Sequence, residues 1–250
     1  MKEGQVLKTK EGYKLIYDQI IGDDNYIVFL AGLSSDRKAT KASFFKNYAK
    51  AKGYSYICFD YLGHGDSDLE FSQCDINMWL SNVKDILANL VPKKAIIIGS
   101  SLGGWLALRL AELDDSKIKA IIGLASAPDF TESLMWNDFS IEVKAKLERG
   151  EIYNLPSDYC DGEYKISMGL INSGRDNLLL NKAEININIP VRLVQGMQDD
   201  DVPYEYGLKL IEKLKTKDAE LCLIKNADHR LSDLPVLNKI SHILEDLIAT

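Results

Sequence analysis

The sequence is poor in residues that cross-link small proteins. It has only four cysteines, and no two of them form a Cys-x-x-Cys pair; they stand at positions 58, 74, 160 and 222. We therefore expect neither a disulfide scaffold nor a cysteine zinc site. Cys58 and Cys222 stand in apolar runs and are expected to be small core residues. Reduced cysteines suit a reducing compartment, so the sequence favours a cytoplasmic protein.

An excess of positive charge and long apolar stretches are also missing. The 30 Lys and Arg residues face 37 Asp and Glu residues, and the net charge of -7 argues against nucleic acid as the main partner. No apolar stretch approaches the ~20 residues of a membrane span, so stable membrane insertion is not expected. The N-terminus shows neither the apolar core of a secretory signal nor the Arg- and Ser-rich composition of a mitochondrial leader.

What the 250 residues do contain is a repeated alternation of strand and helix patterns. Short apolar runs predict strands at 13–20, 25–32, 54–61, 94–99, 117–126, 189–196 and 219–227. Helical spacing predicts helices at 38–53, 75–90, 102–113 and 203–216, and a last one over 236–248. Gly53 should close the first helix, Asp75 should cap the second, and Pro203 should open the fourth. The alternation predicts an α/β protein with a mostly parallel sheet and helices on both faces.

The alternation breaks between about residues 129 and 182. This stretch has aromatic residues, scattered charge and two loop-like segments, NLPSDYCDG at 154–162 and NSGRDN at 172–177. We interpret it as a small cap inserted at the sheet edge of a single domain spanning 1–250. At least two of its large apolar residues should line a pocket; the candidates are Phe130, Leu134, Met135, Trp136, Phe139 and Tyr153.

The motif that carries chemistry is Gly-x-Ser-x-Gly, formed by Gly99, Ser101 and Gly103. It follows an apolar strand and opens an apolar helix, which is the setting of a nucleophile elbow. The two glycines would permit a close approach of strand and helix, and Ser101 would be exposed at the strand end as a nucleophile. The alternative is a Gly-rich turn in which Ser101 only caps the helix. Ser100 fits the glycine spacing less well.

A serine nucleophile needs a histidine base, and the sequence has three histidines. His229 directly follows a predicted strand, at the end where parallel sheets place their active sites. His64 precedes Ser101, which violates the chain order of serine, acid and histidine that goes with this elbow. His242 falls on the polar side of the last helix. His229 is therefore the predicted base.

The orienting carboxylate should follow a strand between Ser101 and His229. Asp199, Asp200 and Asp201 all follow the strand that ends near Gly196. Asp199 leaves the strand first and is the predicted acid, with Asp200 as the alternative, while Asp201 could cap the next helix. Asp60 also ends a strand but precedes the nucleophile.

Two backbone N–H groups should complete the site by binding an oxyanion. One would come from Leu102, which follows the nucleophile. The other would come from the turn after the strand at 25–32, where Leu33 is the expected donor and Gly32 allows close approach to the substrate.

These motifs resemble those of the α/β-hydrolase superfamily over nearly the whole chain. The resemblance rests on Ala-Gly at 31–32, FDYLGHGDS at 59–67, IGSSLGGW at 98–105, QGMQDDDVP at 195–203 and DHR at 228–230. The superfamily's acid motif, Gly-x-x-Asp-x-x-Val-Pro, falls on Gly196, Asp199, Val202 and Pro203. The segments GSSLGGW, NLPSDY and VRLVQGMQDDDVP further resemble a mitochondrial abhydrolase branch of palmitoyl-protein thioesterases and acyl-glucuronide esterases. Ala31 departs from the His-Gly dipeptide of many members.

The resemblance implies a serine hydrolase that cleaves carboxylic esters or thioesters through an acyl-enzyme on Ser101, without a metal or organic cofactor. The expected partner is a small-molecule or acylated-protein substrate. Two alternatives stay open. An acyltransferase would use the same three side chains with an acceptor other than water, and a ligand-binding protein of the same fold would bind without turnover.

Overall fold

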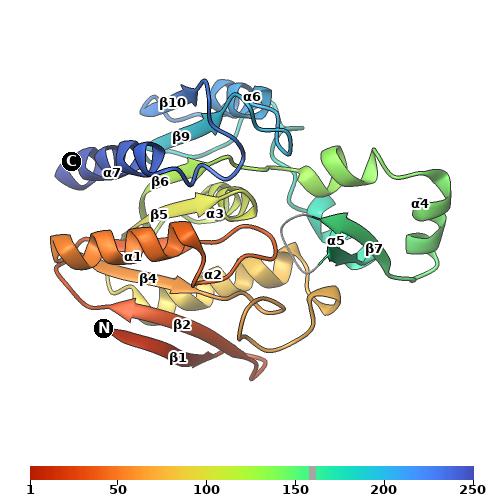
Figure 1. Cartoon of the computed structure of the whole chain (residues 1–250), viewed down its shortest axis with the longest axis horizontal. Coiled ribbons are helices and arrows are strands. Elements are labelled where there is room, and N and C mark those ends of the chain that lie inside the picture. Colours follow the sequence, from red (N-terminus) through yellow and green to blue (C-terminus); the bar gives the residue numbers. More distant parts are fainter. Residues whose placement is uncertain (158–161) are drawn as a thin grey trace.

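An eight-stranded sheet forms the centre of the computed structural model, which describes residues 1–157 and 162–250 (Figure 1). Its strands are β1 (Lys2–Lys8), β2 (Lys14–Ile20), β3 (Tyr26–Leu30), β4 (Ser55–Phe59), β5 (Ala95–Ser100), β6 (Ile118–Leu124), β9 (Val191–Gly196) and β10 (Ala219–Ile224). Across the sheet they follow the order β1-β2-β4-β3-β5-β6-β9-β10. The pairs β1–β2 and β2–β4 are antiparallel, and the five pairs from β4 to β10 are parallel.

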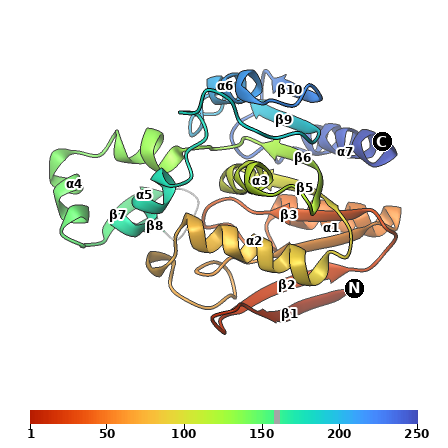
Figure 2. The same cartoon turned by 180° about the vertical axis from the view of Figure 1, so that it is seen from behind.

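Helices cover both faces of this sheet (Figures 1 and 2). They are α1 (Thr40–Lys52), α2 (Ile76–Leu90), α3 (Leu102–Leu113), α6 (Glu205–Lys213) and α7 (Leu234–Ala249), with a short 3-10 turn, η1 (Phe71–Gln73), before α2. α1 and α7 share one face, where the Tyr48 hydroxyl donates to Glu245 at 2.6 Å, and α2, α3 and α6 cover the other. The predicted α/β architecture is confirmed. Within residues 1–157 and 162–250, no helix combines the length and apolarity needed to cross a bilayer.

Local signals in the sequence account for several element boundaries. Asp75 caps α2 by accepting a hydrogen bond from the Met78 N–H at 2.8 Å. Gly53 ends α1 in the left-handed region, with φ of 79°, where a residue without Cβ is favoured. All six residues of β5 are buried, as expected for a central parallel strand. These three predictions are confirmed.

One strand and one helix boundary differ from the prediction. The strand β1 is not predicted, because most of its side chains are exposed and it has little apolar patterning. Its pairing with β2 holds it in the sheet. The helix expected at 203–216 begins at Glu205, so Pro203 does not open its first turn. Instead, the Pro203 carbonyl accepts from the Tyr206 N–H at 2.9 Å in the turn before α6.

The prediction that Cys58 and Cys222 are core residues is fully confirmed for one of them. Cys58 lies in β4 and is buried, and burial raises the pKa of its thiol to about 12, so it is an unreactive core residue. Cys222 is only half-buried, because β10 is the edge strand of the sheet. It packs against the core without being fully buried, so the prediction is confirmed only in part. Cys160 lies outside the described residues.

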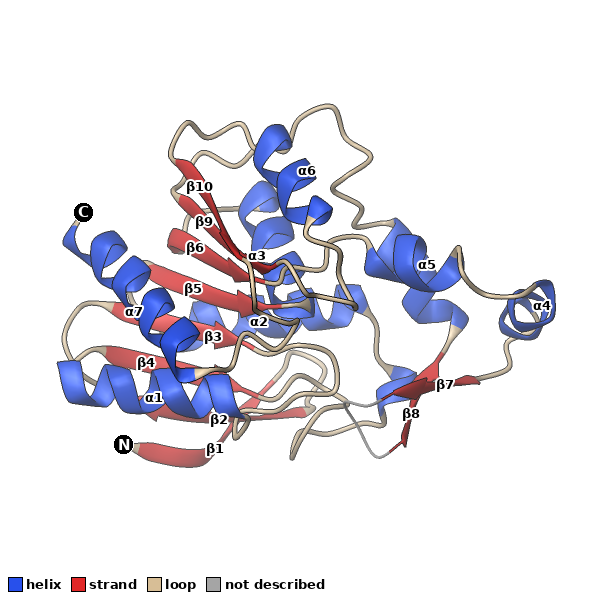
Figure 3. Ribbon diagram, turned by 45° about the horizontal axis from the view of Figure 1, so that its top comes forward, coloured by secondary structure: helices blue, strands red, loops and turns tan. Residues whose placement is uncertain are grey.

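The 129–182 segment has more regular structure than its sequence indicates. Its elements are η2 (Thr131–Trp136, one π-helical turn), α4 (Ile141–Glu148), β7 (Tyr153–Ser157), β8 (Gly162–Ile166) and α5 (Met168–Arg175). β7 and β8 pair antiparallel. Figure 3 places these elements beyond the ends to which the arrows of the parallel strands, such as β3, β4 and β5, point.

The loop predicted at 172–177 is largely wrong, because α5 runs through Arg175. Ser167 caps this helix by accepting from the Leu170 N–H at 3.2 Å. Gly174 lies so close to Thr131 of η2 that a side chain there would collide with the Thr131 hydroxyl. The glycine that suggests a loop in the sequence thus permits helix packing. The loop predicted at 154–162 overlaps β7, and its residues 158–161 lie outside the described residues.

Asp129 ties the two ends of the 129–182 segment together. It has a positive φ of 61°, and its two carboxylate oxygens accept from the Leu179 and Leu180 N–H groups, each at 2.8 Å. The chain therefore leaves the sheet and returns to it at one place. That the segment is a cap within a single domain stays a prediction.

Candidate active site

Ser101 stands in a strained turn between β5 and α3. Its φ of 52° and ψ of -114° are uncommon for a residue with a side chain. A side chain on Gly99 would collide with the Gly103 carbonyl, and one on Gly103 would collide with the Leu30 carbonyl. The close strand–helix contact predicted for the two glycines is present. The Ser101 side chain makes no capping hydrogen bond to α3, which argues against the simple helix-cap alternative.

The structure brings Ser101, His229 and Asp199 together from three separate strand ends. The Ser101 Oγ lies 3.1 Å from His229 Nε2, and His229 Nδ1 lies 2.8 Å from Asp199 Oδ2. Asp199 is buried and His229 is half-buried. The three side chains form one continuous chain of hydrogen bonds, with the serine at one end and the carboxylate at the other.

Four donors converge on the Asp199 carboxylate. Oδ1 accepts from the N–H groups of Asp201 at 3.0 Å and Val202 at 2.7 Å. Oδ2 accepts from His229 and from Gln195 Nε2 at 2.8 Å. Gln195 was not predicted as part of the site, although a polar residue in the apolar strand VRLVQG is a usable signal. Because hydrogen bonds hold both of its oxygens, two on each, the carboxylate is fixed in orientation.

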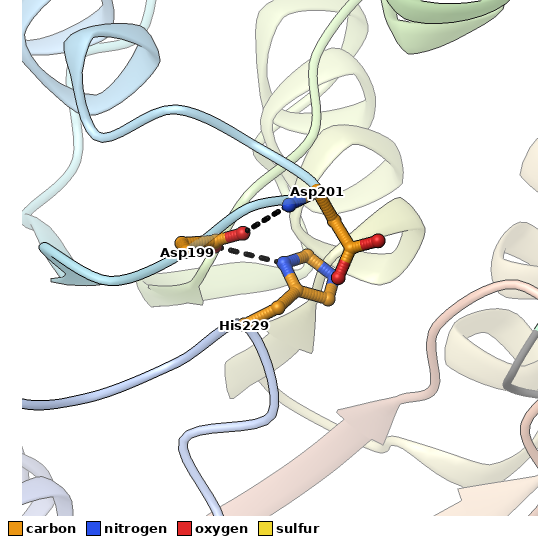
Figure 4. Close-up of side chains that lie close together, drawn as sticks. All are labelled: Asp199, Asp201 and His229. Carbon is orange, nitrogen blue, oxygen red and sulfur yellow. Dashed lines mark hydrogen bonds and ion pairs between the residues drawn. The ribbon is translucent and has the colours of Figure 1, made fainter.

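The neighbouring carboxylates are placed differently. Asp200 is exposed. Asp201 does not cap α6, whose N-cap position is Tyr204; Figure 4 shows the Asp201 and Asp199 carboxyl groups on opposite sides of the His229 ring. Asp60 is buried away from this group and pairs with Arg37. Among the acids weighed from the sequence, the hydrogen bond to His229 Nδ1 is made by Asp199.

The other two histidines have different surroundings. His64 is buried among the rings of Tyr61, Phe71 and Trp79. Burial lowers the pKa of His64 to about 4, so its ring is neutral near pH 7. His242 is exposed on α7. These environments suit a core residue and a surface residue, respectively.

The turn after β3 lies directly against the nucleophile. A Cβ on Gly32 would lie 3.4 Å from the Ser101 Cβ, so the glycine backbone is close to van der Waals contact with Ser101. Leu33 follows in this turn, and Leu102 is the first residue of α3. Their positions are compatible with two N–H donors at one site, and their role as oxyanion donors stays a prediction.

A buried ion-pair cluster holds this turn in place. The Arg37 N–H donates to Asp60 Oδ1 at 2.8 Å, and its guanidinium pairs with Asp60 and, at 3.2 Å, with Asp18. Burial raises the pKa of the Asp60 carboxyl, although its hydrogen bonds and the Arg37 charge oppose the rise. The cluster was not predicted, because its members are far apart in the sequence and meet only in the fold.

A cavity of about 590 Å³ opens beside Ser101 and His229. Its apolar lining comes from the sheet edge and the 129–182 segment, and includes Phe29, Leu33, Phe130, Leu134, Met135 and Leu155. Three of the six predicted lining residues are thus present. The other three are used elsewhere: Trp136 lies under the Arg175 guanidinium, and Phe139 packs edge-on against Tyr153.

Three side chains at the site resemble a metal-binding set. Ligand atoms of Asp199, Asp201 and His229 lie within 4.8 Å of one another (Figure 4). However, both Asp199 oxygens already accept two hydrogen bonds each, and His229 Nδ1 is engaged by Asp199. The arrangement fits a proton-transfer chain better than a cation site.

Comparison with known proteins identifies the family. The alpha/beta hydrolase fold family matches residues 25–154. The chain is 33% identical over 235 residues to the mitochondrial palmitoyl-protein thioesterase ABHD10 of Bos taurus, covering 94% of this chain and 76% of the relative. The chain belongs to the α/β-hydrolase fold family. The predicted α/β-hydrolase fold is therefore confirmed.

Solved structures of this family superpose closely. Mouse alpha/beta hydrolase domain-containing protein 10 has a TM-score of 0.88 and 31% identity, with 98% of each chain covered. A protein from Agrobacterium vitis S4 has a TM-score of 0.90 and 31% identity, with 97% of this chain and 96% of that chain covered. Both superpositions cover nearly the whole α/β-hydrolase chain, the 129–182 segment included.

The relatives overturn the predicted cytoplasmic location. The ABHD10 proteins of cattle, rat and human, at 32–33% identity, are named as mitochondrial. The prediction relied on reduced cysteines, and thiols remain reduced in more than one compartment. Cysteine chemistry was too coarse a basis for choosing among them.

Proposed function

We propose that this α/β hydrolase cleaves carboxylic ester or thioester bonds through an acyl-enzyme on Ser101. Family membership and the 33%-identical thioesterase support the class of reaction. The hydrogen-bonded chain from Ser101 through His229 to Asp199, beside a largely apolar cavity, is the observation that carries the assignment of residues.

In the first half-reaction, Ser101 Oγ attacks the carbonyl carbon while His229 Nε2 takes its proton. The Leu33 and Leu102 N–H groups donate hydrogen bonds to the carbonyl oxygen as negative charge develops on it. When the tetrahedral intermediate collapses, His229 returns the proton to the leaving oxygen or sulfur. Asp199 keeps the His229 proton on Nδ1 and stabilises the imidazolium, so that Nε2 can act as base and then as acid.

In the second half-reaction, water takes the place of the leaving group. His229 Nε2 removes a proton from this water as its oxygen attacks the acyl carbon. Collapse of the second tetrahedral intermediate breaks the bond to Ser101, and the proton from His229 returns to Oγ. The products are a carboxylic acid and the alcohol or thiol, and the enzyme is regenerated.

The apolar part of the cavity suits the acyl group. Phe130, Leu134 and Met135 of the 129–182 segment line the cavity together with Phe29 of the inner strand β3. We infer an acyl donor with an apolar chain, carried by a small molecule or a protein. A transferase with the same residues would give an acylated acceptor as product, and a binding protein would release no product.

The assignment is tested by Ser101→Ala. We expect this variant to lose labelling by a fluorophosphonate probe and to lose hydrolysis of p-nitrophenyl butyrate, while its circular dichroism spectrum is unchanged. Ser100→Ala, at the neighbouring and less suitable serine, should keep the label. Labelling of Ser101→Ala equal to wild type would show that another residue is the nucleophile.

A further inference from the structure

Lys41 is a cation on the wall of the catalytic cavity. It stands in the first turn of α1, is half-buried, and lines the same cavity as Ser101 and His229. Its ammonium donates a hydrogen bond to the carbonyl of Arg230, the residue that follows His229. Among the described residues, no carboxylate lies within ion-pair distance of this ammonium. Within the part of the chain that the structure describes, this positive charge on the wall of the nucleophile's cavity therefore has no dedicated counter-charge.

The surroundings of Lys41 leave it charged but poorly solvated. Burial lowers its pKa, the Asp228 carboxylate partly opposes this and the Arg230 charge adds to it, and together they bring the pKa to about 8. Asp228 itself is held by the N–H groups of Arg230 and Leu231, at 3.0 and 3.2 Å. Near pH 7 most molecules still have the ammonium form. A partly desolvated charge of this kind is stabilised when a ligand brings the opposite charge.

The cavity has two chemically different kinds of lining. Phe130, Leu134 and Met135 of the 129–182 segment are apolar, whereas Lys41, His229, Arg230 and Ser232 are polar. In the reaction proposed above, His229 delivers its proton to the leaving group. Because Lys41 is hydrogen-bonded to the residue next to His229, it belongs to the leaving-group side.

We propose that Lys41 binds a carboxylate on the leaving group of the substrate and so determines specificity. The inference rests on the proposed hydrolase function. One ammonium provides a single positive charge, which matches a monoanion. The preferred substrate would be an acyl ester or thioester with an apolar acyl chain and a carboxylate close to the scissile bond on the other side.

Two thioesters that differ in one group test this proposal. S-butyryl mercaptoacetate has a carboxylate on its leaving group, and S-butyryl mercaptoacetamide has a neutral amide of similar shape. A thiol reagent measures the released thiol for both. We expect wild type to have a KM about tenfold lower for the carboxylate, with similar kcat for the two substrates.

Three variants separate charge from structure. Lys41→Met should raise the KM for the carboxylate about tenfold and change that for the amide less than twofold. Lys41→Arg, which keeps the charge, should retain most of the preference. Lys50→Met, on the exposed part of the same helix, should behave as wild type with both substrates.

The pH dependence of the preference gives an independent measurement. His229 acts on both thioesters in the same way, so its effect cancels in the ratio of their KM values, and the substrate carboxylate stays ionised. As pH rises through about 8, Lys41 loses its proton and the KM ratio should fall toward one. Asp201 and Arg230 also line the cavity, so the same pH series on Lys41→Met, whose KM ratio should not change with pH, assigns the change to Lys41.

Failure of the inference differs from failure of the proposed function. If wild type hydrolyses both thioesters with equal KM, the anion site is wrong and the hydrolase stands. If Lys41→Met lowers kcat equally for both, Lys41 only positions the 229–232 loop, and the specificity role is overturned. If neither thioester is cleaved, mercaptoacetate and mercaptoacetamide are compared as inhibitors of Ser101 labelling; equal inhibition would also overturn the proposal.

Discussion

The Asp199 carboxylate determines which ring nitrogen of His229 holds the proton. Its Oδ1 accepts two backbone N–H groups, which fixes an oxygen at that position. In Asp199→Asn the amide oxygen should take that place, and the NH2 group would then face His229 Nδ1. The imidazole would be forced to hold its proton on Nε2, where it cannot remove the Ser101 proton.

We therefore expect Asp199→Asn to lower kcat for p-nitrophenyl butyrate by about 10⁴-fold, as for the corresponding change in a serine protease. Urea unfolding should show that the fold is kept. Asp200→Asn is the matched control, because Asp200 is the exposed next residue and should leave kcat nearly unchanged. The reverse result would assign the acid role to Asp200.

Individual residues were predictable where the sequence combined a strand end with the correct chain order. That combination singled out Ser101, Asp199 and His229, which the structure brings together. Gln195 and Lys41 were not predicted. Lys41 contacts Arg230, which is far along the chain, and Gln195 contacts Asp199 in the loop after its own strand, but a lone glutamine or lysine has no motif to reveal such a contact.

Among the elements, the 129–182 segment depends on one buried carboxylate at its base. Asp129 accepts the Leu179 and Leu180 N–H groups at 2.8 Å, and Asn tolerates its positive φ. Asp129→Asn replaces one acceptor by an NH2 group that would face an N–H donor. We expect the free energy of unfolding to fall by about 1–3 kcal/mol, measured by urea denaturation.

Asp138→Asn provides the control for this change, because Asp138 is exposed in the same segment. It should stay within about 0.5 kcal/mol of wild type. An equal stability of Asp129→Asn and Asp138→Asn would mean that the two hydrogen bonds at the base of the segment contribute nothing net. Any loss of activity in Asp129→Asn should come from displacement of the 129–182 segment away from the cavity.

Elements with strong periodicity were predicted well, and those held by tertiary contacts were not. α2 and α3 have helical spacing and clear boundary residues, so the sequence alone located them. β1 is held mainly by pairing with β2, and α5 contains Ser and Gly that locally favour a turn. In both cases a neighbouring element supplies the stabilisation that the local sequence lacks.

Over the whole molecule, the alternation of strands and helices predicted the parallel sheet but not its strand order. The exchange of β3 and β4, which puts β3 next to β5, leaves no trace in local patterning. The cavity is likewise a property of the assembled chain, since its lining combines Phe29 of the inner strand β3 with residues of the 129–182 segment such as Phe130 and Tyr164. Its volume and shape should set the acyl length that the enzyme accepts.

The cavity thus leads to a prediction about acyl chain length. Each methylene buried against its apolar lining contributes about 0.8 kcal/mol, or roughly fourfold in kcat/KM, until the cavity is full. Leu134→Trp puts a larger side chain into the lining. We expect it to move the optimum to a shorter chain, lowering kcat/KM for the longest good substrate of wild type about tenfold and leaving that for the acetyl ester nearly unchanged.

A series of p-nitrophenyl esters from acetyl to palmitoyl measures this change. Ile141→Trp is the matched control, because Ile141 is 82% exposed on α4 of the same segment and does not line the cavity. It should reproduce the wild-type profile. If Leu134→Trp lowers kcat/KM for all chain lengths by the same factor, the substitution has disturbed the site as a whole. If it leaves the profile unchanged, the acyl chain lies outside the cavity that the 129–182 segment helps to form.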